Sequence, residues 1–232
     1  MILSKYYVPF LKWRQSEYQA LYKLKEEIKD FIVPYIILPP LEYDFEAKCL
    51  KKTIQEHIEP MPDRIEKKWG TRPALLDFHN SIEEEIMDNG ESVVKYVYTK
   101  ALAMGCKLIP VISLQKSNTY LVEIKSVVIT QKCGIVLRLF LEDLDKLTIN
   151  NEIDKLLSFF DFGIGDIDLI IDLRTPDKFE PYPLFSNLIY TKISYINNLK
   201  DYRSFVIAAN SLDLGEIKQP GGVFTRHEWM LY

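Results

Sequence analysis

The chain has 232 residues, 47% of them hydrophobic and 12% aromatic, so it is long enough to bury one large core. Its formal net charge of −4 argues against the broad positive surface typical of nucleic-acid-binding proteins, although a local basic groove stays allowed. No linker rich in Ser, Gly and Pro divides the sequence. We therefore expect a single domain over residues 1–232.

Cysteine and histidine usage gives no sign of a bound metal. The three cysteines are far apart and form no Cys-x-x-Cys pair, so neither a zinc site nor a disulfide framework is indicated. The histidines lie in separate segments without a neighbour at ligand spacing, and we expect no metal and no cofactor. The first apolar run is too short for a signal peptide, and no run approaches the ~18 apolar residues of a membrane helix. We expect a cytoplasmic protein that does not contact a membrane.

Short apolar runs rich in β-branched residues recur along the chain, a pattern typical of strands buried on both faces of a parallel sheet. In chain order they are residues 7–11, 32–38, 73–77, 108–113, 134–139, 168–173 and 205–209. Between them, apolar residues recur every three or four positions, which predicts helices with one face toward a sheet. The clearest of these helical segments are residues 18–28, 93–104, 120–128 and 153–160.

Alternating strands and helices predict an α/β fold, either a doubly wound sheet or a (β/α) barrel. Seven units favour a TIM-barrel-like repeat of parallel strands. The eighth strand of such a barrel is missing, because a Gly- and Pro-containing loop follows Ala209 and the sequence stops at Tyr232. We expect a shortened barrel or a piece of a longer protein, with one open strand edge.

Polar residues gather at the carboxyl ends of the predicted strands, where parallel barrels carry their sites. If the first strand stays extended as far as Arg14, Lys12 and Arg14 point to the same side. Asp77 ends the third strand. Charged groups at the ends of apolar strands need partners, so we expect them to converge on one another or on a ligand.

The later strands repeat this arrangement. Arg138 lies in the fifth strand, Asp172 and Arg174 share one side at the end of the sixth, and Asn210 follows the seventh. Arginine forks suit phosphate or carboxylate groups, and Asp77 and Asp172 are the candidate general acid and base. The alternative is purely structural: Asp172 pairs with Arg138 or Arg174 and fixes the strand ends.

Three loop segments carry weaker signals. The QPGGVF segment, residues 219–224, offers backbone amides to an anion, but two adjacent glycines favour a plain mobile loop. The FGIGDID segment, residues 162–168, precedes a strand and lacks the third glycine of a dinucleotide-binding fingerprint. The acidic IEEEIMD run, residues 82–88, is typical of a solvated helix face or loop.

The segments YYVPFLKWRQSEYQAL, IVPYIILPPLEYDFE, RPALLDF and RHEW resemble the phage-type beta family proteins of phages, bacteria and mobile elements. The longer match covers Tyr7, Pro9, Leu11, Lys12, Arg14, Gln15, Glu17, Ala20 and Leu21, and the shorter one covers Arg226, Glu228 and Trp229. Family members are typically longer, which implies a further strand beyond Tyr232. The resemblance implies a fold and a genomic setting but no mechanism.

The resemblance also bears on the candidate site. It implies that the cationic end of the first strand is a shared feature, and it adds Glu17 and Arg226 to the candidate ligand-binding residues. Glu17 could equally neutralise Lys12 or interact with the dipole of the first helix.

These observations predict a beta family protein that binds an anionic ligand, phosphate-containing or a nucleotide, at the carboxyl ends of its strands. The alternative is a non-catalytic interaction protein of phage defence or counter-defence, which engages a partner chain or its own copy through the open strand edge. Nucleic acid is the less expected partner, because the composition promises no positive groove. The sequence leaves open whether the protein is an enzyme.

Overall fold

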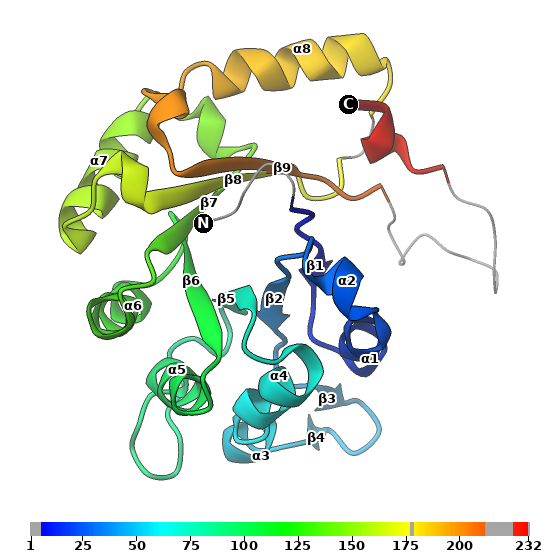
Figure 1. Cartoon of the computed structure of the whole chain (residues 1–232), viewed down its shortest axis with the longest axis vertical. Helices are drawn as coiled ribbons and strands as arrows, with labels where there is room; N and C mark the ends of the chain where they lie inside the picture. Colours follow the sequence, from blue (N-terminus) through cyan, green and yellow to red (C-terminus); the bar gives the residue numbers. More distant parts are fainter. Residues whose placement is uncertain (1–5, 177–178, 212–224, 232) are drawn as a thin grey trace. The chain divides into compact units, whose positions relative to one another are not determined.

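The computed structural model describes residues 6–176, 179–211 and 225–231 of the chain. It divides the chain into two compact parts, the N-terminal part Ile2–Val136 and the C-terminal part Leu137–Tyr232. Strands and helices alternate in each part (Figure 1). The boundary falls inside one strand, β7 (Ile135–Phe140), and the expectation of a single domain stays a prediction.

The sheet of the N-terminal part has parallel strands in the order β1-β2-β5-β6. These strands are β1 (Phe10–Leu11), β2 (Tyr35–Leu38), β5 (Pro73–Phe78) and β6 (Lys107–Ser113). Every residue of β5 and β6 after the first is buried, as their continuous apolar runs predicted. The carboxyl ends of β5 and β6 therefore meet at one edge of a well-packed sheet.

The first two strands are in the predicted place but shorter than predicted. Pro9 and Pro34 have no N–H to donate, so regular pairing begins only after each proline. Tyr7 and Ile32 still form an isolated parallel bridge, and the Tyr35 N–H donates to the Pro9 carbonyl at 2.9 Å. The chain therefore approaches the sheet along the predicted line before the strands formally begin.

Helices connect these strands, and hydroxyl side chains cap three of them. The Thr53, Ser92 and Ser117 side chains accept hydrogen bonds from the first turns of α3, α5 and α6. The helices are α1 (Gln15–Lys23), α2 (Glu26–Lys29), α3 (Ile54–Ile58), α4 (Met61–Trp69), α5 (Val93–Ala103) and α6 (Asn118–Gln131).

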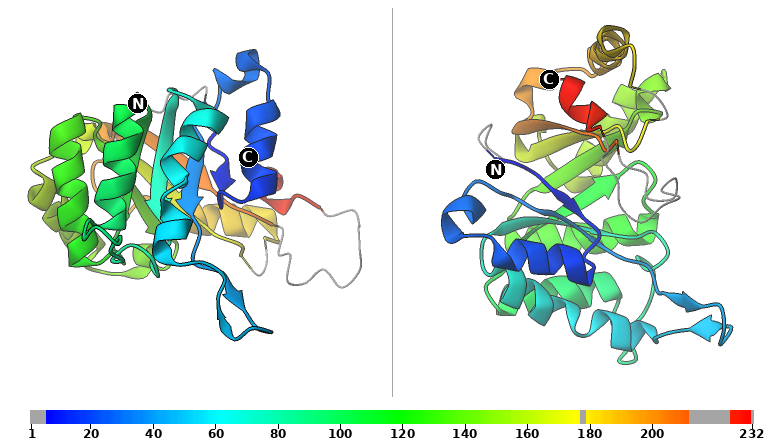
Figure 2. Two further views of the ribbon diagram at one scale, coloured as in Figure 1. Left: turned by 90° about the horizontal axis from the view of Figure 1, so that it is seen from below. Right: turned by 90° about the vertical axis from the view of Figure 1, so that its right-hand side faces the viewer.

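A small antiparallel hairpin, β3 (Tyr43–Asp44) with β4 (Cys49–Leu50), projects from the N-terminal part (Figure 2). Phe45 in its turn is 84% exposed and makes an edge contact with the Tyr43 ring. The sequence analysis did not predict this hairpin, because two-residue strands are too short to show a period.

The C-terminal part has the strand order β7-β8-β9, with β8 (Ile167–Asp172) and β9 (Ser204–Ala208) paired in parallel. Strand β8 is buried throughout, whereas β9 is only half-buried. Its long helices are α7 (Ile149–Phe160) and α8 (Tyr182–Ile193). This part also contains the 3-10 turns η1 (Asp143–Asp145), η2 (Ile164–Asp166), η3 (Leu199–Asp201) and η5 (His227–Leu231). Helix α8 runs alongside β9 (Figure 1).

An ion pair fixes the amino ends of the strands in the C-terminal part. Asp168 at the start of β8 is fully buried and accepts two hydrogen bonds from the Arg203 guanidinium, at 3.0 and 2.6 Å. It accepts a third from the Ser204 hydroxyl, at 2.7 Å. Because Arg203 and Ser204 stand where β9 begins, Asp168 sets the register of β9 against β8.

The α/β class and the seven predicted strands are confirmed. The predicted QPGGVF loop lies outside the described residues. Among the described residues, no helix is long and apolar enough to span a membrane.

Candidate functional site

A buried lysine and two carboxylates meet beyond the carboxyl ends of β5 and β6. Asp77, the penultimate residue of β5, is 3% exposed. Its Oδ2 accepts a hydrogen bond from the Tyr35 hydroxyl at 2.7 Å, and its Oδ1 lies 2.8 Å from the Lys116 Nζ. Lys116 comes from the loop between β6 and α6. Strand β2, strand β5 and the loop after β6 therefore each contribute one side chain here.

Lys116 is bound on several sides at once. Its Nζ lies 2.8 Å from the Glu83 carboxylate, 2.5 Å from the Phe78 carbonyl and 3.2 Å from Asn80 Oδ1. The Tyr120 ring covers the ammonium at 4.7 Å from its centroid. We call Tyr35, Asp77, Asn80, Glu83 and Lys116 the Lys116 cluster. Its two carboxylates share one ammonium, and its contacts tie the loop after β5 to the loop after β6.

The sequence analysis named Asp77 but missed Lys116 and Glu83. Glu83 belongs to the acidic run interpreted as a solvated face or loop; the run is irregular, but Glu83 itself is 4% exposed, so a solvated position is wrong for it. One signal was available for Lys116, which follows the buried strand β6 by three residues. Extending the search for polar residues a few positions past each strand end would have included it.

The first strand ends at Leu11, and the prediction that extension persists to Arg14 is wrong. Trp13 has a left-handed backbone conformation, φ 50°, which turns its side chain into the core at 1% exposure. Lys12 and Arg14 on either side are exposed. A buried tryptophan therefore anchors the turn from β1 to α1, and the two cations face solvent.

The residues around Trp13 also start the first helix. Arg14 occupies the N-cap position of α1, and its N–H donates to the Glu17 Oε2 at 3.3 Å. Glu17 thus caps the helix, one of the two roles expected for it. The described residues give the Lys12 ammonium no ion pair or hydrogen bond.

A second charged group lies at the carboxyl ends of β7 and β8 in the C-terminal part. The Arg138 Nε donates to Asp172 Oδ2 at 2.9 Å, and its terminal NH2 donates to the same oxygen at 2.5 Å. The side chains of Arg138 and Asp172 are 16% and 7% exposed. The structural alternative considered for Asp172, pairing with Arg138, is what the structure shows.

Arg174 is held in an unusual backbone conformation beside this pair. Its φ is 55°, in the left-handed region that a residue with a side chain rarely adopts. Asp172 Oδ1 accepts the Arg174 N–H at 2.8 Å, and the Arg174 carbonyl accepts the Asn210 N–H at 2.8 Å. Asp172 therefore orients both arginines, one through each carboxylate oxygen.

Both guanidiniums lie against the same phenyl ring. The Cζ of Arg174 lies 3.9 Å from the Phe140 ring centroid, and the Cζ of Arg138 lies 4.6 Å from it. A guanidinium stacked on a ring keeps its N–H donors pointing outward in its own plane, where they can meet phosphate or carboxylate oxygens. We call Arg138, Phe140, Asp172 and Arg174 the Arg–Phe site.

The two arginines of the Arg–Phe site differ in how far their donors are used. The Arg174 side chain is 55% exposed. Among the described residues, the carboxylate that it approaches is Glu142, at 3.7 Å, which is too long for a hydrogen bond. Within the described part of the chain, the Arg174 guanidinium makes no hydrogen bond. Arg174 is therefore the arginine of this site that can receive an anion from solvent.

The last predicted ligand-binding residue, Arg226, has a different partner. It donates to Glu228, which also accepts a hydrogen bond from the Ser211 hydroxyl. Burial alone raises the pKa of the Glu228 carboxyl, but hydrogen bonds from Ser211, from its own backbone N–H and from Arg226 together hold the pKa below its ordinary value. Glu228 thereby links the end of β9 to η5.

The described residues, 6–176, 179–211 and 225–231, contain no set of side chains arranged as metal ligands. No three His, Cys, Asp or Glu side chains within them are grouped so that they could hold a metal ion. The described cysteines Cys49, Cys106 and Cys133 are free thiols.

Comparison with known proteins decides the family. The family model described as Beta protein matches residues 7–232, nearly the whole chain. The chain belongs to the Beta protein family. A search of curated proteins found no match.

In this Beta protein family member, the two segments that carried the resemblance contribute to the fold. Pro9 and Leu11 lie along the approach to the sheet, Glu17 caps α1, and the Leu21 side chain is buried under that helix. Glu228 is 6% exposed and holds Ser211 and Arg226. The Beta protein family pattern therefore includes residues that fix local structure, beside the exposed cations Lys12 and Arg14.

Proposed function

We propose that this Beta protein family member binds an anionic, phosphate-containing ligand such as a nucleotide at the Arg–Phe site. The Arg174 guanidinium is the principal ligand-binding group in this proposal. Asp172 pairs with Arg138 and also fixes the backbone of Arg174, and both guanidiniums lie against Phe140.

One observation carries the proposal: Arg174 is ordered on its buried side and open on the other. Its backbone is fixed by Asp172 and Asn210, and its guanidinium is stacked on Phe140. An arginine positioned in this way loses little conformational entropy when it binds an anion.

Local charge supports the same assignment. Asp172 pairs closely with Arg138. Among the described residues, the one carboxylate that forms an ion pair with the Arg174 guanidinium is Glu142, whose side chain is 70% exposed and therefore screened by water. A doubly charged phosphate could displace this contact and accept the in-plane hydrogen bonds of the guanidinium.

The carboxylates Asp77 and Asp172 stay candidates for a general acid and base. In the described contacts each is held close to a cation, Lys116 or Arg138. That arrangement favours an orienting role over proton transfer, and binding is therefore the core of the proposal.

We also propose a (β/α)-barrel-like architecture for the whole protein and a cytoplasmic location. The succession of buried parallel strands and covering helices supports the architecture. The free thiols support a reducing compartment.

The test uses pyrophosphate and ATP as probes in isothermal titration calorimetry. For Arg174→Ala we expect affinity to fall by about 10- to 100-fold, because charge-assisted hydrogen bonds contribute about 1.5–3 kcal/mol. Arg174→Lys should recover only part of the loss, since lysine keeps the charge but lacks the planar fork.

Lys155→Ala is the matched control, because Lys155 is an exposed cation on α7 in the same part of the chain. It should leave the affinity within about twofold, as expected for a screened surface charge. The proposal fails if the wild-type chain binds neither probe, or if Arg174→Ala and Lys155→Ala weaken binding equally.

A further inference from the structure

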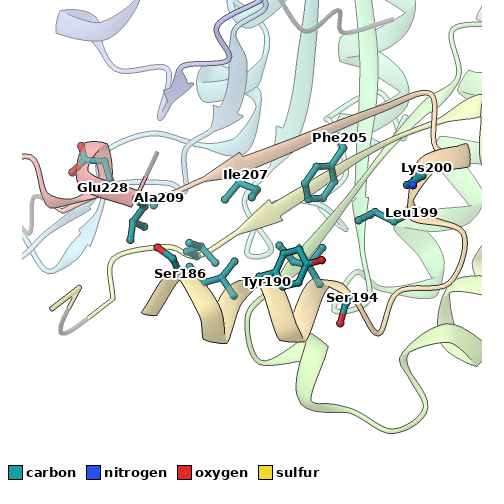
Figure 3. Close-up of a pocket in the computed structure, with 13 residues that line it drawn as sticks. Ser186, Tyr190, Ser194, Leu199, Lys200, Phe205, Ile207, Ala209 and Glu228 are labelled. Carbon is teal, nitrogen blue, oxygen red and sulfur yellow. The ribbon is translucent and has the colours of Figure 1, made fainter. Parts of the chain in front are cut away.

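The C-terminal part contains an apolar cavity of about 470 Å³ between helix α8 and strand β9 (Figure 3). Its position is set by the half-buried face of β9, which α8 covers only partly. From this cavity we infer a binding site for a ligand with a linear apolar body and an anionic head, of which a medium-chain fatty carboxylate is the simplest example.

The walls match an aliphatic body. Ile189 and Ile193 of α8 line one side, and Phe205 and Ile207 of β9 line the other. The volume lies within the range of about 300–1000 Å³ that small-molecule sites occupy. Phe205 and Tyr190 stand at the cavity while 37% and 76% exposed, so an occupant would cover apolar surface that now meets water.

Charge at the two ends sets the orientation of the ligand. Lys200 and Ser194 stand at one end of the cavity, and Glu228 stands at the other (Figure 3). The Lys200 ammonium has no ion pair or hydrogen bond among the described residues. The Glu228 carboxylate is already bound by Ser211 and Arg226, so it needs no further cation and would repel an anion. The anionic head therefore lies at Lys200, and the apolar tail points toward Glu228.

This site is separate in chemistry from the Arg–Phe site. Arg174 offers stacked guanidinium donors at exposed strand ends, whereas the cavity offers mostly aliphatic walls and one ammonium. A ligand that needs both an aliphatic slot and a single cation fits the cavity and not the Arg–Phe site. The inference does not depend on the proposed function.

The test is calorimetric titration of the full chain with octanoate, decanoate and dodecanoate below their micellar concentrations. Each added methylene group should contribute about 0.8 kcal/mol, so each two-carbon step should tighten binding by about tenfold until the cavity is full. Decanol is the uncharged comparison, since it keeps the apolar body without the anionic head.

Two variants test the two halves of the ligand. Lys200→Gln should weaken decanoate binding by about fivefold or more while leaving decanol binding unchanged, because it removes only the cation. Ser186→Trp places a large side chain in the cavity from the α8 side and should weaken both ligands by tenfold or more. Circular dichroism establishes that Ser186→Trp is folded, and Lys200→Gln changes only a solvent-exposed side chain.

Lys155→Gln is the control, because Lys155 is exposed and does not line the cavity. The inference is overturned if none of the three fatty carboxylates binds, or if their affinity is independent of the length of the carboxylate. It is also overturned if Lys200→Gln and Lys155→Gln have the same affinity for decanoate. Sedimentation equilibrium tests whether a second copy of the protein occupies the cavity instead. A dimer that excludes decanoate and is broken by Ser186→Trp would also overturn it.

Discussion

The Lys116 cluster and the Arg–Phe site place cations at the carboxyl ends of parallel strands, but they use the charge in opposite ways. The Lys116 side chain is 3% exposed, and four oxygen atoms lie within 3.2 Å of its ammonium. The Arg174 side chain is 55% exposed, and within the described residues its guanidinium makes no hydrogen bond. Charge at a strand end therefore does not identify a ligand site unless donors are left over and accessible.

The difference follows from where the partners come from. The oxygen atoms around Lys116 belong to the strand β5 and the loop that follows it, so the local fold itself saturates the ammonium. Asp172 binds two arginines: its oxygens accept hydrogen bonds from the Arg138 side chain and from the Arg174 backbone N–H. The Arg174 side chain is left to an aromatic ring and solvent. The first arrangement holds two loops of the fold together, and the second leaves the donors of one guanidinium facing solvent.

The largest expected effect comes from removing the cation of the Lys116 cluster. Lys116→Met keeps the aliphatic stem but leaves the buried Asp77 and Glu83 carboxylates without their shared ammonium. Loss of one member of a buried ion pair costs about 3–5 kcal/mol. Urea denaturation should show the free energy of unfolding of the variant lowered by that amount.

Lys107→Met is the matched control, because Lys107 is exposed at the start of β6. It should change the free energy of unfolding by less than about 0.5 kcal/mol. If Lys116→Met lowers the free energy of unfolding by less than about 1 kcal/mol, the Lys116 cluster does not stabilise the fold.

A smaller effect is expected for the carboxylate of the Arg–Phe site. Asp172→Asn keeps the shape of the side chain but removes the charge that holds Arg138. Because Arg138 retains some exposure, we expect the free energy of unfolding to fall by about 1–3 kcal/mol, less than in Lys116→Met. Glu142→Gln, which alters a 70% exposed carboxylate 3.7 Å from Arg174, should be nearly neutral. Equal losses in the two variants would contradict the assignment of Asp172 as the group that orders this site.

The strands and the Arg138–Asp172 pair could be predicted from the sequence for the same reason. Strands buried on both faces must be continuously apolar, so β5, β6 and β8 are visible as runs, and a charged residue inside or just after such a run stands out. Arg138 and Asp172 were found in this way, and the structure brings them together.

Of the Lys116 cluster, only Asp77 was found by the same reasoning, because Asn80, Glu83 and Lys116 come from loops. Which loop residue reaches Lys116 depends on the path of the chain after β5, and no periodicity encodes that path. The turn at Trp13 is a similar case. Tryptophan has no preference for a left-handed backbone, so its φ of 50° follows from the burial of the ring in the folded protein.

The smallest effect concerns the aromatic groups behind the Lys116 cluster at high pH. Burial raises the pKa of the Tyr98 and Tyr120 hydroxyls well above the ordinary value. The unfolded chain would release these protons near pH ~10, while the folded protein keeps them. These two hydroxyls therefore leave the free energy of unfolding independent of pH below pH ~10. Above that pH the free energy of unfolding falls by about 1.4 kcal/mol per pH unit for each tyrosine.

Tyr120→Phe tests this, because it removes one such hydroxyl together with its 2.8 Å hydrogen bond to the Val111 carbonyl. Urea denaturation at pH 9.5, 10.5 and 11 should give a shallower loss of stability with pH in the variant than in the wild-type chain. Tyr190→Phe removes a hydroxyl from a 76% exposed side chain and should leave the slope unchanged. Identical slopes for all three proteins would show that Tyr120 meets water in the folded state, and the enclosure of Lys116 beneath its ring would then be wrong as well.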